Sequence, residues 1–138
     1  MSTDDVAAEI LSTFDTITVV GASANPAKPS NEVPAVMKAL GWRIIPVNPT
    51  ATTIVDETVY PSIADVPEQV GFVDVFRPSA DCPDIARQAV AAGARALWLQ
   101  LGITSPEARA IAEDAGLLYV EDRCLKIEQR RTGITPKR

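Results

Sequence analysis

The feature that most constrains the fold is a repeated alternation of short apolar runs with longer stretches of helical periodicity. The runs are rich in Val, Ile and Thr and too short for helices, which is typical of buried parallel strands. Glycine follows several of the helical stretches, as at Gly41, Gly93 and Gly116. Such strand and helix alternation without long linkers predicts an α/β fold. We expect residues 1–138 to form a single-domain, Rossmann-like, doubly wound parallel sheet with helices on both faces.

The boundaries of the elements follow from these periodicities and from turn residues. Strands are expected at residues 16–20, 42–47, 72–76, 96–99 and 117–120, with a further short strand at 58–60. Helices are expected at residues 2–14, from about 30 to 40, from about 81 to 92, from 106 to 115 and at the start of the basic tail 126–138, with one helical turn at 62–66. Ser30 and Ser105 are predicted to cap the helices that follow them.

Length and charge exclude several classes of function. A chain of 138 residues can bury one core without metal or disulfide support. The net charge of −5 argues against a nucleic-acid partner, which would require clustered Lys and Arg. No apolar run approaches the roughly 20 residues that span a bilayer, and residues 1–15 lack the pattern of a signal peptide. We therefore expect a cytoplasmic protein without a membrane partner, and assign no oligomeric state.

The amino-acid composition also limits the chemistry. The chain has no histidine, which excludes Ser-His-Asp and Cys-His catalysis and phosphohistidine intermediates. Its cysteines, Cys82 and Cys124, are far apart in sequence, and both are expected to be thiols rather than a disulfide or metal ligands. No catalytic residue and no metal site are predicted.

The loop between the first expected strand and the next helix can bind an anion. Gly21 ends the strand, and backbone N–H groups beside a positive helix end suit a pyrophosphate. Compared with the dinucleotide pattern G-x-G-x-x-G, the loop has Ser23 at the second glycine position and Pro26 at the third, so the match is poor. A tight turn would explain Gly21 equally well.

The residues after the second expected strand and one lysine limit which nucleotide ligands are compatible with the loop. NAD enzymes place an acid after the second strand, where this chain has Val47, Asn48 and Pro49. Lys28 lies in the first loop, where its ammonium could neutralise a phosphate. Coenzyme A (CoA) carries a ribose 3′-phosphate as well as a pyrophosphate. The pattern therefore favours CoA or NADP over NAD.

Several short strings, in this order, resemble a known family. They are Val20-Gly21-Ala22-Ser23, Asn25-Pro26, Lys28-Pro29-Ser30, Gly41-Trp42, Pro46-Val47-Asn48-Pro49, Val73-Asp74-Val75-Phe76-Arg77, Trp98-Leu99-Gln100-Leu101-Gly102 and Asp122-Arg123-Cys124. Together they cover nearly the whole chain and resemble the stand-alone CoA-binding domain family. That family is similar to the N-terminal domain of the succinyl-CoA synthetase α subunit and of ADP-forming acyl-CoA synthetases.

The resemblance implies roles for individual residues. It places the CoA phosphates at Ala22, Ser23 and Lys28, and it places the loops 47–49 and 76–77 beside the adenosine and pantetheine. The synthetases also use a phosphorylated histidine in a second domain, and without any histidine this chain is not expected to act as a ligase. The residues expected at the ligand are Gly21, Ala22, Ser23, Lys28, Ser30, Val47, Asn48, Pro49, Phe76, Arg77 and Gln100.

Some of these residues, and a few others, have competing interpretations. Arg77 could bind phosphate, cap a helix end or reach solvent, and Gln100 could bind the ligand or tie two loops together. Cys124 could be a reactive thiol near the pantetheine, although an inert, buried thiol is favoured. Asp74 lies in the middle of a strand and is expected to have a hydrogen-bond partner.

Two further features are given structural interpretations. The two tryptophans, Trp42 and Trp98, are expected to pack in the core. The alternating charges of residues 121–131 are expected to form a solvated helix face.

The leading hypothesis is a non-catalytic module that binds CoA or an acyl-CoA. A second is an enzyme, either an NADP-dependent reductase or a CoA-transferring component that acts with a partner protein. A third is a regulatory protein with a vestigial nucleotide site.

Overall fold

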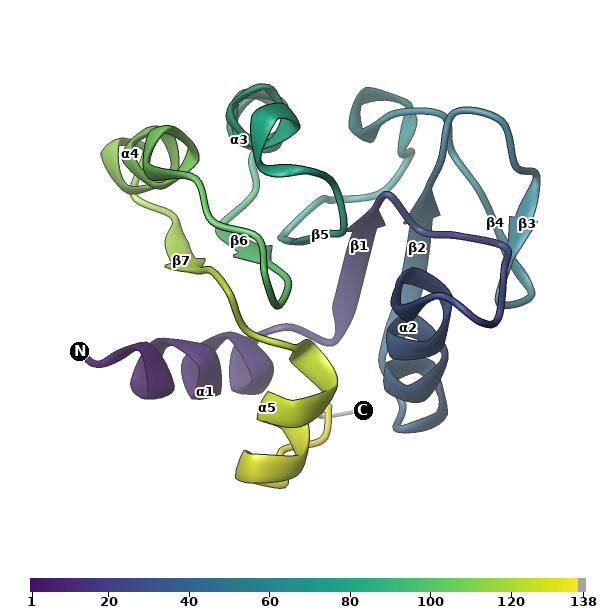
Figure 1. The fold of residues 1–138 in the computed structure, drawn as a ribbon, viewed down its shortest axis with the longest axis horizontal. Coiled ribbons are helices and arrows are strands. Elements are labelled where there is room, and N and C mark those ends of the chain that lie inside the picture. The colour runs from purple at the N-terminus through teal and green to yellow at the C-terminus, as the bar shows by residue number, and fades with distance from the viewer. Residues whose placement is uncertain (137–138) are drawn as a thin grey trace.

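A five-stranded parallel sheet forms the centre of the computed structural model, which describes residues 1–136 (Figure 1). Its strands, in spatial order, are β2 (Arg43–Val47), β1 (Thr16–Val20), β5 (Phe72–Val75), β6 (Ala96–Leu99) and β7 (Leu118–Val120). The chain runs outward from β1 to β2, then returns to the other side of β1 and continues through β5 to β7. The direction of winding therefore changes between β1 and β5. The predicted doubly wound α/β fold is confirmed.

Helices cover both faces of the sheet (Figure 1). One face carries α1 (Thr3–Thr13), α2 (Pro29–Ala39) and α5 (Leu125–Thr132), and the other carries α3 (Cys82–Ala91) and α4 (Pro106–Asp114). Each layer of helices buries its own apolar cluster against the sheet. Within the described residues, no helix combines the length and apolar character needed to cross a membrane.

Both tryptophans pack in the core, as predicted. Trp42 and Trp98 are at most 2% exposed and lie in the cluster beneath α1, α2 and α5. Their indole N–H groups donate to the carbonyls of Phe14 and Arg123, each at 2.9 Å. These bonds satisfy the one polar atom that each buried ring carries.

The segment between β2 and β5 differs from the expected single strand. Two strands of two residues each, β3 (Thr53–Ile54) and β4 (Glu57–Thr58), form a hairpin. The strand expected at residues 58–60 is therefore found at residues 57–58. Tyr60 instead makes an isolated parallel bridge to Val47. The helical turn expected at 62–66 is present as a 3-10 helix, η1 (Ile63–Asp65), and a second one, η2 (Ser79–Asp81), precedes α3.

The predicted cap at Ser30 is wrong, whereas the one at Ser105 is confirmed. Helix α2 begins at Pro29, so Ser30 is already its second residue and Lys28 occupies the capping position without a side-chain hydrogen bond. Proline favours the first helical position, because its φ is preset and it has no N–H to satisfy. In α4 the Ser105 hydroxyl accepts from the Ala108 N–H at 3.1 Å.

The charged stretch 121–131 is solvated in part: Asp122, Arg130 and Arg131 are exposed, as predicted, but Glu128 is buried, which corrects the prediction for that residue. Glu128 is 4% exposed, because α5 packs against α1. Its carboxylate lies 3.3 Å from Arg123 and 3.0 Å from Arg131. Arg123 also reaches Asp4 of α1 at 2.8 Å. We call these four residues the α1–α5 clamp.

The predicted helical start of the basic tail is confirmed in α5, and residues 137–138 of that tail lie outside the described part of the chain.

Candidate ligand-binding site

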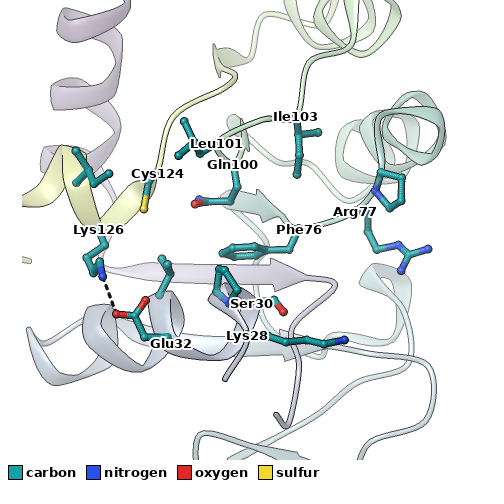
Figure 2. Close-up of a pocket in the computed structure, with 14 residues that line it drawn as sticks. Lys28, Ser30, Glu32, Phe76, Arg77, Gln100, Leu101, Ile103, Cys124 and Lys126 are labelled. Carbon is teal, nitrogen blue, oxygen red and sulfur yellow. Dashed lines mark hydrogen bonds and ion pairs between the residues drawn. The ribbon is translucent and has the colours of Figure 1, made fainter. Parts of the chain in front are cut away.

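Two neighbouring pockets open at the carboxyl ends of the parallel strands, where doubly wound sheets bind ligands. The polar pocket has a volume of about 650 Å³ and is lined by Val20, Gly21, Ala22, Ser23, Lys28, Ser30, Val47, Asn48, Pro49, Pro61, Ser62, Ile63, Phe76, Arg77, Ala80, Asp81, Asp84, Ile85 and Gln88. The apolar pocket has a volume of about 580 Å³ and is lined by Lys28, Pro29, Ser30, Glu32, Val33, Phe76, Arg77, Pro78, Gln100, Leu101, Ile103, Cys124, Lys126 and Ile127 (Figure 2).

The structure gathers all of the predicted site residues around these pockets. Gln100 lines the apolar pocket, and every other predicted residue lines the polar one. Lys28, Ser30, Phe76 and Arg77 belong to both, so the two pockets adjoin at these side chains. Whether each residue touches a ligand stays a prediction.

Gly21 is required by the packing of the strand ends. Its φ is +83°, and a Cβ there would lie 2.5 Å from the Phe76 carbonyl oxygen and 2.9 Å from Cδ of Arg77. Its N–H donates to the Val47 carbonyl at 3.1 Å. The close approach of three chain segments therefore accounts for this glycine, as the tight-turn interpretation proposed.

The first loop is held to the start of α2 through the backbone of Ser23. Pro34 has no N–H, so the Ser30 carbonyl one turn earlier lacks its helical partner, and it accepts from the Ser23 N–H at 3.2 Å. The Asn31 side-chain amide donates to the Ser23 carbonyl at 2.8 Å. The proline inside α2 thus frees the acceptor that positions the loop.

Asn48 ties the loop after β2 to the loop after β1. Its Nδ2 donates to the Ala22 carbonyl at 2.9 Å, and its Oδ1 accepts from the N–H groups of Thr50 and Ala51, each at 2.9 Å. Both ends of the amide are used within the protein. This residue therefore shapes the wall of the polar pocket.

Uncommitted donors meet where the two pockets adjoin. Among the described residues, no carboxylate lies within ion-pair distance of the Lys28 ammonium, and no acceptor takes the Ala22 N–H, the Ser30 N–H or the Ser30 hydroxyl. The first N–H groups of α2 carry the positive end of the helix dipole. Arg77 is not a free donor of this kind, because its guanidinium is paired with the carboxylate of Asp81 at 2.7 Å. Lys28 and the start of α2 therefore form a corner whose free donors could hold an anion, and we call it the anion-binding corner.

Gln100 links three elements beneath the apolar pocket. Its Nε2 donates to Asp74 of β5 at 2.5 Å, and its Oε1 accepts from the Leu125 N–H of α5 at 3.3 Å. This is the tying role considered for Gln100. Asp74 is fully buried and has the predicted partner, but its Oδ2 has none within residues 1–136. Burial raises the pKa of Asp74 to about 7, against the opposing effect of the Gln100 hydrogen bond.

The two cysteines are free thiols in different surroundings. Cys82 is buried in α3, and burial raises its pKa to about 11, so it stays protonated at neutral pH. Cys124 is half-buried and lines the apolar pocket beside Gln100 (Figure 2). Within the described chain, no three side chains that could ligate a metal ion lie together.

Sequence reasoning missed the part of the apolar pocket that α2 and α5 supply, namely Glu32, Val33, Lys126 and Ile127. Its walls come from α2, from the loops after β5 and β6 and from α5, and they include Val33, Leu101, Ile103 and Ile127. The loop after β6 was expected at the ligand edge, but the contribution of α5 was not. The available signal was Ile127, an apolar residue two positions after Leu125 in an otherwise polar helix.

Comparisons with known proteins identify the family and agree with the fold. Residues 15–130 match the family described as CoA binding domain. The chain is 32% identical over 119 residues to the uncharacterized protein YneT of Bacillus subtilis (strain 168), covering 86% of this chain and 88% of that protein. A solved structure of a hypothetical protein from Pyrococcus horikoshii OT3 superposes with a TM-score of 0.90 at 32% identity, covering 96% of this chain and 92% of that one.

One relative has a named activity. Over 79 residues the chain is 32% identical to the acetate–CoA ligase (ADP-forming) II of Archaeoglobus fulgidus, which corresponds to 56% of this chain but only 12% of the ligase. The family match spans most of the chain, and the predicted resemblance is confirmed. This chain belongs to the CoA binding domain family.

Proposed function

We propose that this chain binds CoA, free or as an acyl thioester, across the two adjoining pockets and catalyses no reaction on its own. The observation that carries the proposal is the anion-binding corner. An unpaired lysine, the free N–H groups of Ala22 in the loop and Ser30 in the helix, and the free Ser30 hydroxyl lie there between a polar and an apolar pocket. Family membership supports the same ligand.

The chemistry of CoA fits these surroundings. Its nucleotide end is highly anionic, whereas its pantetheine arm is uncharged and carries methyl and methylene groups between two amides, which corresponds to the characters of the two pockets. Each pocket volume, about 650 Å³ and about 580 Å³, is within the range of roughly 300–1,000 Å³ common for small-molecule sites. In this arrangement the phosphates lie against Ala22, Ser23 and Lys28, and the pantetheine passes Phe76 toward Gln100.

The absence of catalysis in this proposal follows from the groups available. The chain has no histidine, and Asp74 is sealed in the core beneath Gln100. The raised pKa of Cys82 keeps that thiol from acting as a nucleophile at neutral pH. A reaction would therefore need the pocket-lining thiol of Cys124 or groups supplied by a partner protein.

Calorimetry on the full chain with CoA, 3′-dephospho-CoA, NAD and NADPH tests the proposal. We expect CoA to bind more tightly than NAD or NADPH. Lys28→Ala should weaken CoA by roughly tenfold, since it removes a charged donor to phosphate. The matched control is Lys38→Ala, at the opposite end of α2, where the lysine pairs with Glu57 at 3.0 Å.

The outcomes separate several alternatives. If Lys28 contacts the 3′-phosphate, Lys28→Ala weakens the binding of CoA more than the binding of 3′-dephospho-CoA. Equal losses of affinity for the two ligands would instead place the lysine at the pyrophosphate. Unchanged affinity for both would remove Lys28 from the site. Failure of the wild-type chain to bind CoA at millimolar concentration would refute the proposal, and tighter binding of NADPH would favour the reductase alternative.

A further inference from the structure

The apolar pocket has the chemistry of a site for a hydrocarbon chain. We infer, on the basis of the proposed function, that the ligand is an acyl-CoA with an uncharged, apolar acyl group. The acyl chain would lie between α2, α5 and the loop after β6, against Val33, Leu101 and Ile127.

Exposed apolar surface is concentrated at this pocket. Leu101 is 63% exposed and Ile127 is 50% exposed, and both line it. The other large exposed apolar side chains of the described residues, Met1 and Leu40, lie outside both pockets. Because apolar surface gains free energy when it leaves water, a hydrocarbon chain that covers Leu101 and Ile127 is stabilised there.

The occupant is identified by what adjoins this surface. The apolar pocket is continuous with the anion-binding corner through Lys28 and Ser30. A ligand that fills both must therefore be anionic at one end and apolar at the other. An acyl thioester of CoA has this form, with the acyl chain extending beyond the pantetheine.

The charged side chains of the apolar pocket argue against an acyl group that ends in a carboxylate. Lys126 is neutralised by Glu32 at 2.6 Å, on the opposite side of the pocket from Arg77 (Figure 2). Arg77 is likewise paired with Asp81. Lys28 remains free, but it lies at the end assigned to phosphate.

Ser30 also lines this pocket with a free hydroxyl, but like Lys28 it lies at the end assigned to phosphate; away from that end, the remaining polar side chain of the wall is Gln100, and its amide is committed. Both ends of the Gln100 amide are bonded within the protein, to Asp74 and Leu125. A terminal carboxylate would therefore lose its hydration without gaining a partner, which is costly. A terminal methyl group carries no such cost.

Calorimetry with a matched series of thioesters tests this inference. The probes are CoA, acetyl-CoA, butyryl-CoA, hexanoyl-CoA and succinyl-CoA. From acetyl to hexanoyl we expect the affinity to rise about two- to fourfold per methylene, as for partial to full burial of each group. Succinyl-CoA has the same number of acyl carbons as butyryl-CoA and should bind at least tenfold more weakly than it.

Substitutions at the wall of the apolar pocket test whether the dependence on acyl chain length arises there. Ile127→Ser and Leu101→Ser, both at exposed positions, should lower the hexanoyl-to-acetyl affinity ratio toward one. Leu40→Ser, at an exposed position outside both pockets, should leave that ratio unchanged. Glu32→Gln releases Lys126 from its partner and should raise the succinyl-to-butyryl ratio severalfold.

Several results would overturn the inference. Equal affinities across the thioester series would overturn the inference of an apolar acyl group. They would leave the proposed function intact, since CoA would still bind. A chain-length dependence that persists in both serine variants would place the acyl group elsewhere. Sedimentation that shows a dimer abolished by Ile127→Ser, together with equal thioester affinities, would mean that a second copy covers this surface. Absence of any CoA binding would instead refute the proposed function itself.

Discussion

Asp74 places a carboxyl group in the core beneath the apolar pocket. Its Oδ1 accepts from Gln100, while its Oδ2 has no partner among the described residues. A charged carboxylate in this position is poorly solvated, so the folded protein favours the protonated acid. The same group links β5, through Gln100, to the start of α5.

The contribution of Asp74 to the stability of the protein should therefore fall as pH rises from acid to neutral. The pKa of Asp74 is 3.8 in the unfolded reference and about 7 in the fold. Between pH 3.8 and about 7, Asp74 keeps its proton in the folded chain but has released it in the unfolded chain. The stabilisation from Asp74 is therefore fully present below pH 3.8 and is lost as the pH rises to about 7. The loss is on the order of 4 kcal/mol.

Urea unfolding at a series of pH values measures this effect. Asp74→Asn keeps an oxygen that can accept from Gln100 but cannot ionise, and it should remove most of the decline. The difference between the two proteins isolates Asp74 from other titrating groups. Identical pH profiles for wild type and variant would show that Asp74 does not titrate in this range.

At the scale of single elements, α2 and α4 begin alike in sequence but differ in structure. Each has a proline at its first position and a serine next to it, but Ser105 precedes its proline and caps, whereas Ser30 follows its proline and does not. The Ser30 hydroxyl consequently faces the pockets without a partner. The start of α2 is thus left with donors free for a ligand.

Two alanine variants test this difference. Ser105→Ala should lower the free energy of unfolding by about 1 kcal/mol, because the Ala108 N–H loses its acceptor. Ser30→Ala should change it by less than about 0.5 kcal/mol, because no cap is lost. Denaturant unfolding of both variants, with CoA absent, provides the measurement. A larger loss from Ser30→Ala would restore its assignment as the cap.

At the scale of the whole molecule, the α1–α5 clamp joins the two ends of the chain. Arg123 connects Asp4 of α1 with Glu128 of α5. The first turn of α5 supplies Lys126 and Ile127 to the apolar pocket. The clamp therefore holds one wall of that pocket in place against the sheet.

Breaking the clamp should be costly compared with breaking an exposed ion pair. Glu128→Gln should lower the free energy of unfolding by about 1–3 kcal/mol, since a buried carboxylate between two arginines is replaced. Glu113→Gln, whose exposed side chain lies 3.9 Å from Arg109, should cost less than about 0.5 kcal/mol. Thermal or urea unfolding compares the two. Equal, small losses would show that the clamp does not contribute to stability.

The elements and their order could be predicted from local sequence alone. Strand and helix periodicity, together with glycine and proline, placed all five parallel strands and the helices to within a few residues. The carboxyl ends of parallel strands meet at one edge, so the loops beginning at Gly21, Asn48 and Arg77 could be expected together. That much is encoded over short distances along the chain.

What only the tertiary structure decided depends on contacts between distant segments. Glu128 is buried because α5 packs against α1, and no local pattern distinguishes it from a solvated charge. The apolar pocket arises where α2, α5 and two strand ends meet, so its side chains share no spacing in sequence. The sequence by itself determined the sheet and the position of the loop that we propose binds the anion, through local periodicity and turn chemistry. The tertiary structure decided which charges are neutralised and where the apolar pocket forms, because both depend on which distant side chains come together.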